Sequence, residues 1–214
     1  AGRAAGFVSA NRDITLRKLA EEKLQQAKDA VEVAYAELEH ALAREQLLAR
    51  TDSLTNLFNR RHFFLLADHE FSVAMRYEQP VSAIIFDVDH FKNVNDRWGH
   101  YVGDDVLRHV SRIAQKQVRA ADILARYGGE EFIILLPNSS AAEAANVAER
   151  IRRKVLAYRI DPEHTQAGIT VSVGVAEKDA RVQTLDDLIR RADHALYAAK
   201  GAGRNCVKIY QASV

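Results

Sequence analysis

Two adjacent glycines, Gly128 and Gly129, lie between two runs of β-forming residues. Glycine adopts positive φ angles without steric cost, so the pair predicts a tight hairpin between two strands. Glu130 and Glu131 follow at the tip, where a charge does not help to close a core. Bare backbone lets a ligand approach closely, and adjacent carboxylates suit a hard cation. The pattern predicts either a functional turn or an ordinary hairpin with solvated glutamates.

A second acidic segment lies upstream, at the end of the apolar run 81–86. Asp87 and Asp89 are one residue apart, so in extended chain both side chains leave the same face. Ligands of open α/β sheets bind beyond the carboxyl ends of strands. We therefore expect Asp87, Glu130 and Glu131 to converge on a divalent ion. Mg²⁺ suits such a site, because it is held by one or two carboxylates plus substrate phosphates, and no Cys/His cluster favours a softer metal.

These segments belong to a set of ordered motifs that resembles the GGDEF family of diguanylate cyclases, in a GGEEF variant. The resemblance covers about residues 51–210, and several motifs at compatible spacings are more specific than any one alone. The motifs are TDSLTNLFNRR (51–61), DVDHFK (87–92), ND (95–96), GHYVGD (99–104), GGEEF (128–132) and AAKGAGRN (198–205).

The fold class that this resemblance and the local patterns imply is α+β: a ferredoxin-like βαββαβ palm with flanking helices. Its expected helices are 59–77, 103–119, 141–156 and 185–199, and its expected strands are 81–86, 122–127, 132–136, 168–175 and 207–210. We expect Trp98, Tyr158 and Tyr197 to pack in cores, as most aromatic residues do.

The activity that the resemblance implies is condensation of two GTP molecules into cyclic di-GMP with release of two pyrophosphates. Each domain of a homodimer would hold one GTP. The implied metal ligands for Mg²⁺, with Mn²⁺ as an alternative, are Asp87, the Val88 carbonyl, Glu130 and Glu131. The implied catalytic residues are these three acids and Lys92, with Glu130 accepting the 3′-hydroxyl proton.

Further substrate-binding residues are also implied by the resemblance. Asn95 and Asp104 resemble the guanine-reading positions, since an amide and a carboxylate match the base's acceptor and donor edges. Lys92, Lys200 and Arg204 resemble the cations around the triphosphate, where charge-assisted bonds are strong. The remaining implied contacts are Phe91, His100, Gly128 and Gly129.

A possible control site precedes the glycine turn. Arg119 and Asp122 have the Arg-x-x-Asp spacing that in this family forms an inhibitory site for the product, and Arg150 is a further candidate for that site. A guanidinium and a carboxylate can together bind a guanine edge and a phosphate. The alternative is a salt bridge at a helix end, which stabilises little at an exposed surface.

The N-terminal quarter of the chain has a different composition. Residues 14–50 contain no Gly or Pro and are rich in helix formers. An a row (Leu24, Val31, Leu38) and a d row (Ala27, Ala34, Ala41, Leu48) predict a parallel two-stranded coiled coil, and the alternative is a lone helix that packs on its own domain. Glu45 interrupts the a row, and Tyr35 and Leu42 offer a seam displaced by one position. Residues 1–13 resemble the end of a PAS sensor domain, and 51–214 form the expected catalytic domain.

Composition excludes several classes of function. The net charge of +1 over 214 residues provides no basic field for DNA, RNA or an anionic membrane. A single cysteine, Cys206, rules out an intramolecular disulfide framework and fits a reducing compartment. No apolar run spans a bilayer, so we expect a cytoplasmic fragment whose full-length parent could be membrane-tethered.

Three alternatives to an active cyclase remain. The domain could be a catalytically silent receptor for GTP or cyclic di-GMP, although such relatives typically lose the turn glycines or acids that are retained here. It could be a dimerisation and signal-relay module, which only the N-terminal helix supports. It could make mixed or adenine dinucleotides, but the Asp104 carboxylate favours the N–H donors of guanine.

Overall fold

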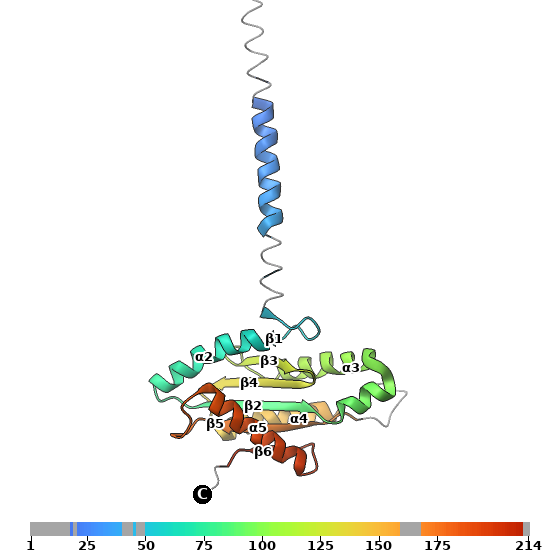
Figure 1. Ribbon diagram of the computed structural model, residues 1–214, viewed down its shortest axis with the longest axis vertical. Helices are drawn as coiled ribbons and strands as arrows, with labels where there is room; N and C mark the ends of the chain where they lie inside the picture. The colour runs from blue at the N-terminus through green and yellow to red at the C-terminus, as the bar shows by residue number, and fades with distance from the viewer. Residues whose placement is uncertain (1–17, 19–20, 40–44, 46–49, 159–167, 212–214) are drawn as a thin grey trace, which may run out of the picture. The chain divides into compact units, whose positions relative to one another are not determined.

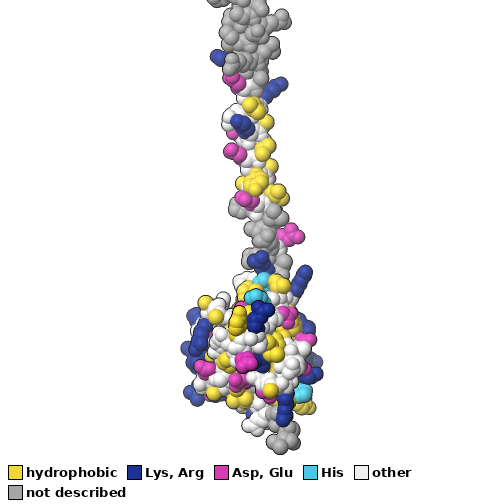
Figure 2. All heavy atoms as spheres, turned by 90° about the vertical axis from the view of Figure 1, so that its left-hand side faces the viewer, with side chains coloured by type: hydrophobic (Ala, Val, Ile, Leu, Met, Phe, Trp, Pro, Cys, Tyr) yellow, Lys and Arg dark blue, Asp and Glu magenta, His cyan; other side chains and the backbone are white. Residues whose placement is uncertain are grey.

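The computed structural model describes residues 18, 21–39, 45, 50–158 and 168–211, and the chain divides into two compact units, Ala1–Ala49 and Arg50–Val214. In the first unit residues 21–39 are helical. Figure 2 shows hydrophobic side chains gathered along one side of this segment. In the predicted a row, Leu24, Val31 and Leu38 are 58%, 67% and 56% exposed. The proposed PAS end, 1–13, and the seam residues Ala41, Leu42 and Leu48 lie outside the described residues.

The second unit is a six-stranded sheet with helices on both faces (Figure 1). In chain order its elements are β1 (Phe58–Asn59), α2 (Arg60–Arg76), β2 (Val81–Val88), α3 (Phe91–Gln115), β3 (Ile123–Gly128), β4 (Glu131–Pro137), α4 (Ala141–Leu156), β5 (Val171–Glu177), α5 (Leu185–Gly201) and β6 (Val207–Ile209). None of the described helices is long and apolar enough to cross a membrane.

The sheet order β1-β3-β4-β2-β5-β6 contains the predicted βαββαβ palm. Its four inner strands pair antiparallel, β3 with β4, β4 with β2, and β2 with β5. The short strands β1 and β6 add to the two edges in parallel. The predicted fold class is therefore confirmed, with β1 as an additional edge strand that the sequence did not reveal.

The central strand β2 is buried along its whole length. Alternate side chains of a strand leave opposite faces, and both faces of β2 are apolar. Ile84, Phe86 and Val88 join the core under α3 and α4, and Val81, Ala83 and Ile85 join the core under α2 and α5. The ring of Phe86 stacks on that of Phe132 in β4, with centroids 5.0 Å apart. Burial of apolar side chains contributes roughly 25 cal/mol per Å² of apolar area. Because β2 contributes side chains to both cores, it is the strand around which the other elements pack.

Helix α3 differs most from the prediction. It begins at Phe91 rather than at residue 103, ends at Gln115 rather than at 119, and bends at Gly99, where φ is 82°. The bend folds the two halves of the helix toward each other, so that a Cβ atom at Gly103 would collide with the Asn95 carboxamide. Glycine at 103 permits this close approach. The sequence pattern predicts the start of the helix at this position.

Smaller corrections concern one strand and one aromatic side chain. Strand β5 begins at Val171 rather than at 168. Trp98 and Tyr158 pack against the core as expected. The interpretation of Tyr197 as a packing residue was wrong, because this side chain is 80% exposed on α5.

Candidate active site at the end of the central strand

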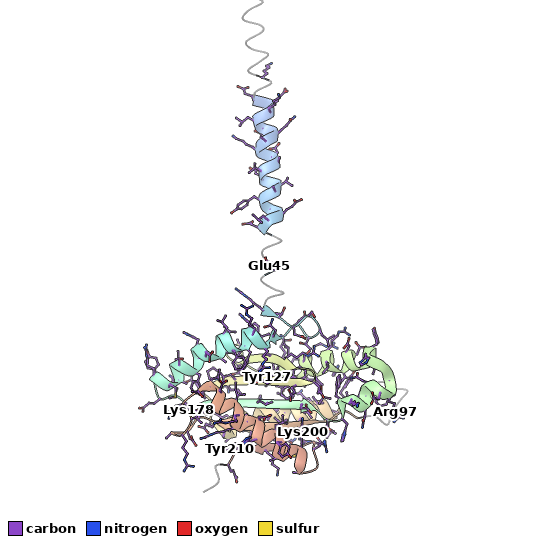
Figure 3. The ribbon with its side chains drawn as sticks, in the orientation of Figure 1. Glu45, Arg97, Tyr127, Lys178, Lys200 and Tyr210 are labelled. Atoms are coloured by element: carbon purple, nitrogen blue, oxygen red, sulfur yellow. The ribbon has the colours of Figure 1, made fainter. Side chains whose placement is uncertain are left out.

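Asp87 is the second-to-last residue of the central strand β2, which is buried along its whole length. It is 7% exposed. Lys200, which extends from the C-terminal part of α5 (Figure 3), places its Nζ 3.1 Å from Asp87 Oδ2. Burial raises the pKa of Asp87 to about 6; the Lys200 ammonium opposes the rise, and the carboxylates of Glu130 and Glu131 add to it. The Lys200 ammonium therefore partly neutralises the Asp87 carboxylate, which is also repelled by Glu130 and Glu131.

The glycine hairpin brings the other two acids to this strand end. Glu131 begins β4 and lies directly opposite Asp87 in the antiparallel register. The Val88 amide donates to the Glu130 carbonyl at 3.3 Å. Gly129 has φ of 46°, the left-handed conformation that glycine adopts most easily. The predicted neighbours Asp87, Val88, Glu130 and Glu131 thus come together from two strands and one turn.

The Arg126 guanidinium contacts the backbone of the glycine hairpin. Arg126 donates from Nε to the Gly129 carbonyl at 2.8 Å and pairs through Nη1 with Asp52 Oδ2 at 3.1 Å. Partial burial alone would raise the pKa of Asp52, but hydrogen bonds from Thr55 and the charge of Arg126 hold it below its ordinary value. Asp52 lies in the motif at the entrance of the domain and Arg126 in the strand before the glycines, and the sequence indicated no role for either. Residue 52 is thereby connected to the glycine turn.

Asp89 has a different role from Asp87, although both lie on the α5 side of the sheet. It is 6% exposed, and its carboxylate accepts hydrogen bonds from the hydroxyls of Ser172 and Thr170, each at 2.6 Å, and from the Asn205 amide at 3.1 Å. A carboxylate that accepts three such bonds is held in place as a structural anchor. It joins the end of β2 to the start of β5 and to the loop after α5.

The residues that resemble guanine readers lie along α3. The Asn95 carboxamide packs on Gly103, next to Asp104, and its Oδ1 is buried without a hydrogen-bond partner among the described residues. Phe91 is buried at the start of the helix, whereas Lys92 and His100 are exposed on it. The Gly99 bend lies between Asn95 and Gly103, whose close approach places Asn95 near the start of the segment that carries Asp104.

The proposed product site forms around a separate hollow. Arg119, Asp122 and Arg150 line one cavity of ≈140 Å³ between α4 and the segment that follows α3. The Asp122 carboxylate accepts from the Arg119 backbone amide at 2.7 Å, which closes the turn after α3. Arg150 donates to the Gln117 carbonyl at 3.1 Å. The Arg119 side chain itself is exposed, so its guanidinium is accessible from solvent.

The donor set at the strand end fits a hard divalent cation. Three carboxylates and main-chain carbonyls offer only oxygen, which is what Mg²⁺ and Mn²⁺ prefer. The raised pKa of Asp87 reflects burial and carboxylate repulsion that a bound cation would relieve. Within the described part of the chain no three His, Cys, Asp or Glu side chains are already grouped closely enough to ligate an ion. The residues therefore suit such an ion by their chemistry, and their side chains would have to close around it.

An acidic strand end beside a glycine turn, on a ferredoxin-like sheet, is the arrangement of a nucleotidyl-cyclase-like palm domain. The family model "Diguanylate cyclase, GGDEF domain" matches residues 49–206. The response regulator PleD of Caulobacter vibrioides is 40% identical over 172 residues, which is 79% of this chain and 37% of PleD. The probable diguanylate cyclase DgcT of Escherichia coli K12 is 42% identical over 173 residues, with 79% and 37% covered.

Solved structures agree. The coiled coil and GGDEF domain of DgcB from Caulobacter crescentus, in complex with c-di-GMP, superposes with a TM-score of 0.78 at 35% identity, covering 86% of this chain and 98% of that one. The active GGEEF domain of a diguanylate cyclase from Vibrio cholerae gives 0.69 at 36% identity, covering 72% and 98%. The chain belongs to the GGDEF family of diguanylate cyclases. It spans less than half the length of the curated relatives named above.

The raised pKa of Asp87 predicts that this residue lowers stability at neutral pH. The folded state binds its proton more tightly than the unfolded state does, so the contribution of Asp87 to stability falls as pH rises from about 4 to 6. In metal-free protein at pH 7.5 we expect Asp87→Asn to raise the free energy of unfolding by about 1–2 kcal/mol. That is less than the full pKa shift implies, because Lys200 loses its partner.

Urea denaturation at pH 4.5 and at pH 7.5 measures this effect. The gain should shrink toward pH 4.5. Asp68→Asn, which removes an exposed carboxylate on α2, should show no such pH-dependent gain. An Asp87→Asn protein that is less stable than wild type at both pH values contradicts the prediction.

Proposed function

We propose that this chain is an active diguanylate cyclase that condenses two GTP molecules into cyclic di-GMP. The observation that carries the proposal is the strand register that places Glu131 opposite Asp87, next to Glu130 and an exposed glycine turn, with Lys200 as a counter-charge. Membership of the family supports the same conclusion. All residues of the acidic turn are retained, which favours an enzyme over a silent receptor.

The proposed chemistry makes two phosphodiester bonds. The 3′-oxygen of one GTP attacks the α-phosphorus of the other, Glu130 accepts the hydroxyl proton, and pyrophosphate leaves; the second, reciprocal attack closes the ring. Such reactions depend on in-line positioning and charge neutralisation more than on covalent help. A divalent ion held by Asp87, the Val88 carbonyl, Glu130 and Glu131 would supply charge stabilisation for the phosphates. Lys92, Lys200 and Arg204 would hold the triphosphate, while Asn95 and Asp104 would read guanine.

Two domains must face each other for this reaction, because each is proposed to hold one GTP. The exposed apolar row on the N-terminal helix supports a parallel coiled coil as the dimerisation element. The DgcB structure that resembles this chain likewise comprises a coiled coil and a GGDEF domain. The dimerisation-relay alternative predicts the same association without turnover.

The central test is turnover of GTP by purified protein with Mg²⁺, followed by chromatography of the products. We expect cyclic di-GMP from wild type and from Asp68→Asn. Glu130→Gln should lose at least about 10²-fold in rate, the contribution of a positioned general base. If wild type binds GTP and dimerises but forms no product, the chain is a receptor rather than a cyclase.

The coiled coil can be tested with two valines on the same helix. Val31 lies in the a row, whereas Val33, which is 60% exposed, lies outside both rows. Val31→Glu should weaken dimerisation by about tenfold or more, since a charge in the seam is costly, and turnover per chain should fall with it at low protein concentration. Val33→Glu should do neither. Analytical ultracentrifugation and turnover over a dilution series measure both, and equal behaviour of the two variants contradicts the seam.

We also propose product inhibition through the cavity lined by Arg119, Asp122 and Arg150. These three are among the polar side chains that line the hollow, and a guanidinium and a carboxylate there suit a guanine edge and a phosphate. Arg119→Ala should raise the inhibition constant of cyclic di-GMP by about tenfold or more, because a charge-assisted bond is lost. Arg190→Ala, an exposed arginine on α5, serves as the control. Unchanged inhibition in Arg119→Ala would remove this site from the proposal.

A further inference from the structure

The turn formed by residues 203–205 has an unusual backbone. Gly203, Arg204 and Asn205 have φ angles of 101°, 66° and 44°, so three consecutive residues are left-handed. Non-glycine residues seldom adopt this conformation, and two in succession persist only where surrounding contacts hold them. The 203–205 turn lies between α5, which carries Lys200, and β6.

Asn205 is held from two sides. Its backbone amide donates to Asp89 Oδ2 at 3.1 Å. From α4, Arg152 donates through Nη1 to Asn205 Oδ1 at 2.7 Å and to the Asn205 carbonyl at 3.4 Å. One side chain thus contacts both the backbone and the carboxamide of a left-handed residue.

Arg152 is itself fixed in place. Its Nε and Nη2 donate to the two carboxylate oxygens of Glu149 at 2.7 and 2.8 Å, and its side chain is only 16% exposed. A bidentate guanidinium–carboxylate pair restricts geometry as well as charge. The neighbouring Arg153 also pairs with Glu149, at 2.7 Å, but it is 73% exposed. Glu149 and Asn205 therefore hold Arg152 at both ends, from α4 to the turn.

We propose that Arg152 is a positioning residue for GTP: by fixing Asn205 it holds the 203–205 turn so that Arg204 and Lys200 meet the triphosphate. This inference rests on the proposed function, in which both cations bind phosphate. Arg204 is exposed, and its amide donates to the Ala199 carbonyl at 3.1 Å, so the turn folds back onto the end of α5. Arg152 acts through the backbone and contacts no substrate.

The first measurement is amide hydrogen exchange of peptides covering residues 200–206. Arg152→Gln should raise exchange in this segment by about tenfold, which corresponds to about 1.4 kcal/mol. Arg153→Gln, which removes an adjacent arginine on the same glutamate, should not. Unchanged exchange in Arg152→Gln overturns the proposal at its structural step.

The second measurement is affinity for a GTP analogue with a methylene group between the α- and β-phosphorus atoms. Its dissociation constant should rise by about tenfold in Arg152→Gln, and in turnover KM should rise while kcat changes by less than about twofold. In an Arg204→Gln background the effect of Arg152→Gln should shrink, because the two residues act through the same turn. Equal effects in both backgrounds indicate a merely structural role and overturn the proposal.

These readouts separate the inference from the proposed function. Formation of cyclic di-GMP by wild type tests the function alone. Exchange and analogue affinity test the role of Arg152 even if no product forms. Increased exchange with unchanged analogue affinity also overturns the proposal, because the turn would then be free to move without consequence for phosphate binding.

Discussion

The end of strand β2 is the constraint on which the rest of the structure depends. The strand is buried over its full length between two antiparallel neighbours, so it is the rigid centre of both cores. Its carboxyl end carries Asp87, which is nearly as buried as the apolar residues before it. A carboxylate there needs compensation, because removing a charge from water is costly without a partner. The Lys200 ammonium provides that compensation and brings the end of α5 to the site.

The raised pKa of Asp87 shows that the charges of the site oppose the stability of the free protein. Glu130 and Glu131 lie near Asp87 and, with burial, raise its pKa to about 6. Repulsion of this kind is relieved when a cation or a bound substrate complex adds positive charge. The neighbouring Asp89, by contrast, accepts three hydrogen bonds from neutral donors. The two acids of one motif thus differ in their surroundings, because Asp87 is paired with the Lys200 ammonium instead.

Two arginines support the site from outside it. Arg126 joins the glycine turn to Asp52 at the entrance of the domain, and Arg152 joins α4 to the turn after α5. Each satisfies a backbone carbonyl in a segment that contains left-handed residues. Such segments need external contacts to stay in one conformation. The conformations of the two turns at the site therefore depend on arginines that contact neither the acidic residues of the site nor the proposed substrate.

The sequence alone determined the fold class, most element positions and the acidic cluster, because burial periodicity, paired glycines and motif spacing are local properties of the chain. It did not reveal β1, the start of α3 or the bend at Gly99, since a short edge strand and a bent helix depend on contacts with distant segments. The exposure of Tyr197 was missed for the same reason. Only the tertiary structure decided which charge compensates Asp87, which acid is an anchor, and which arginines hold the turns. The long-range pairings among these join residues 53 to 116 positions apart, and no local pattern specifies which of many charged side chains will meet.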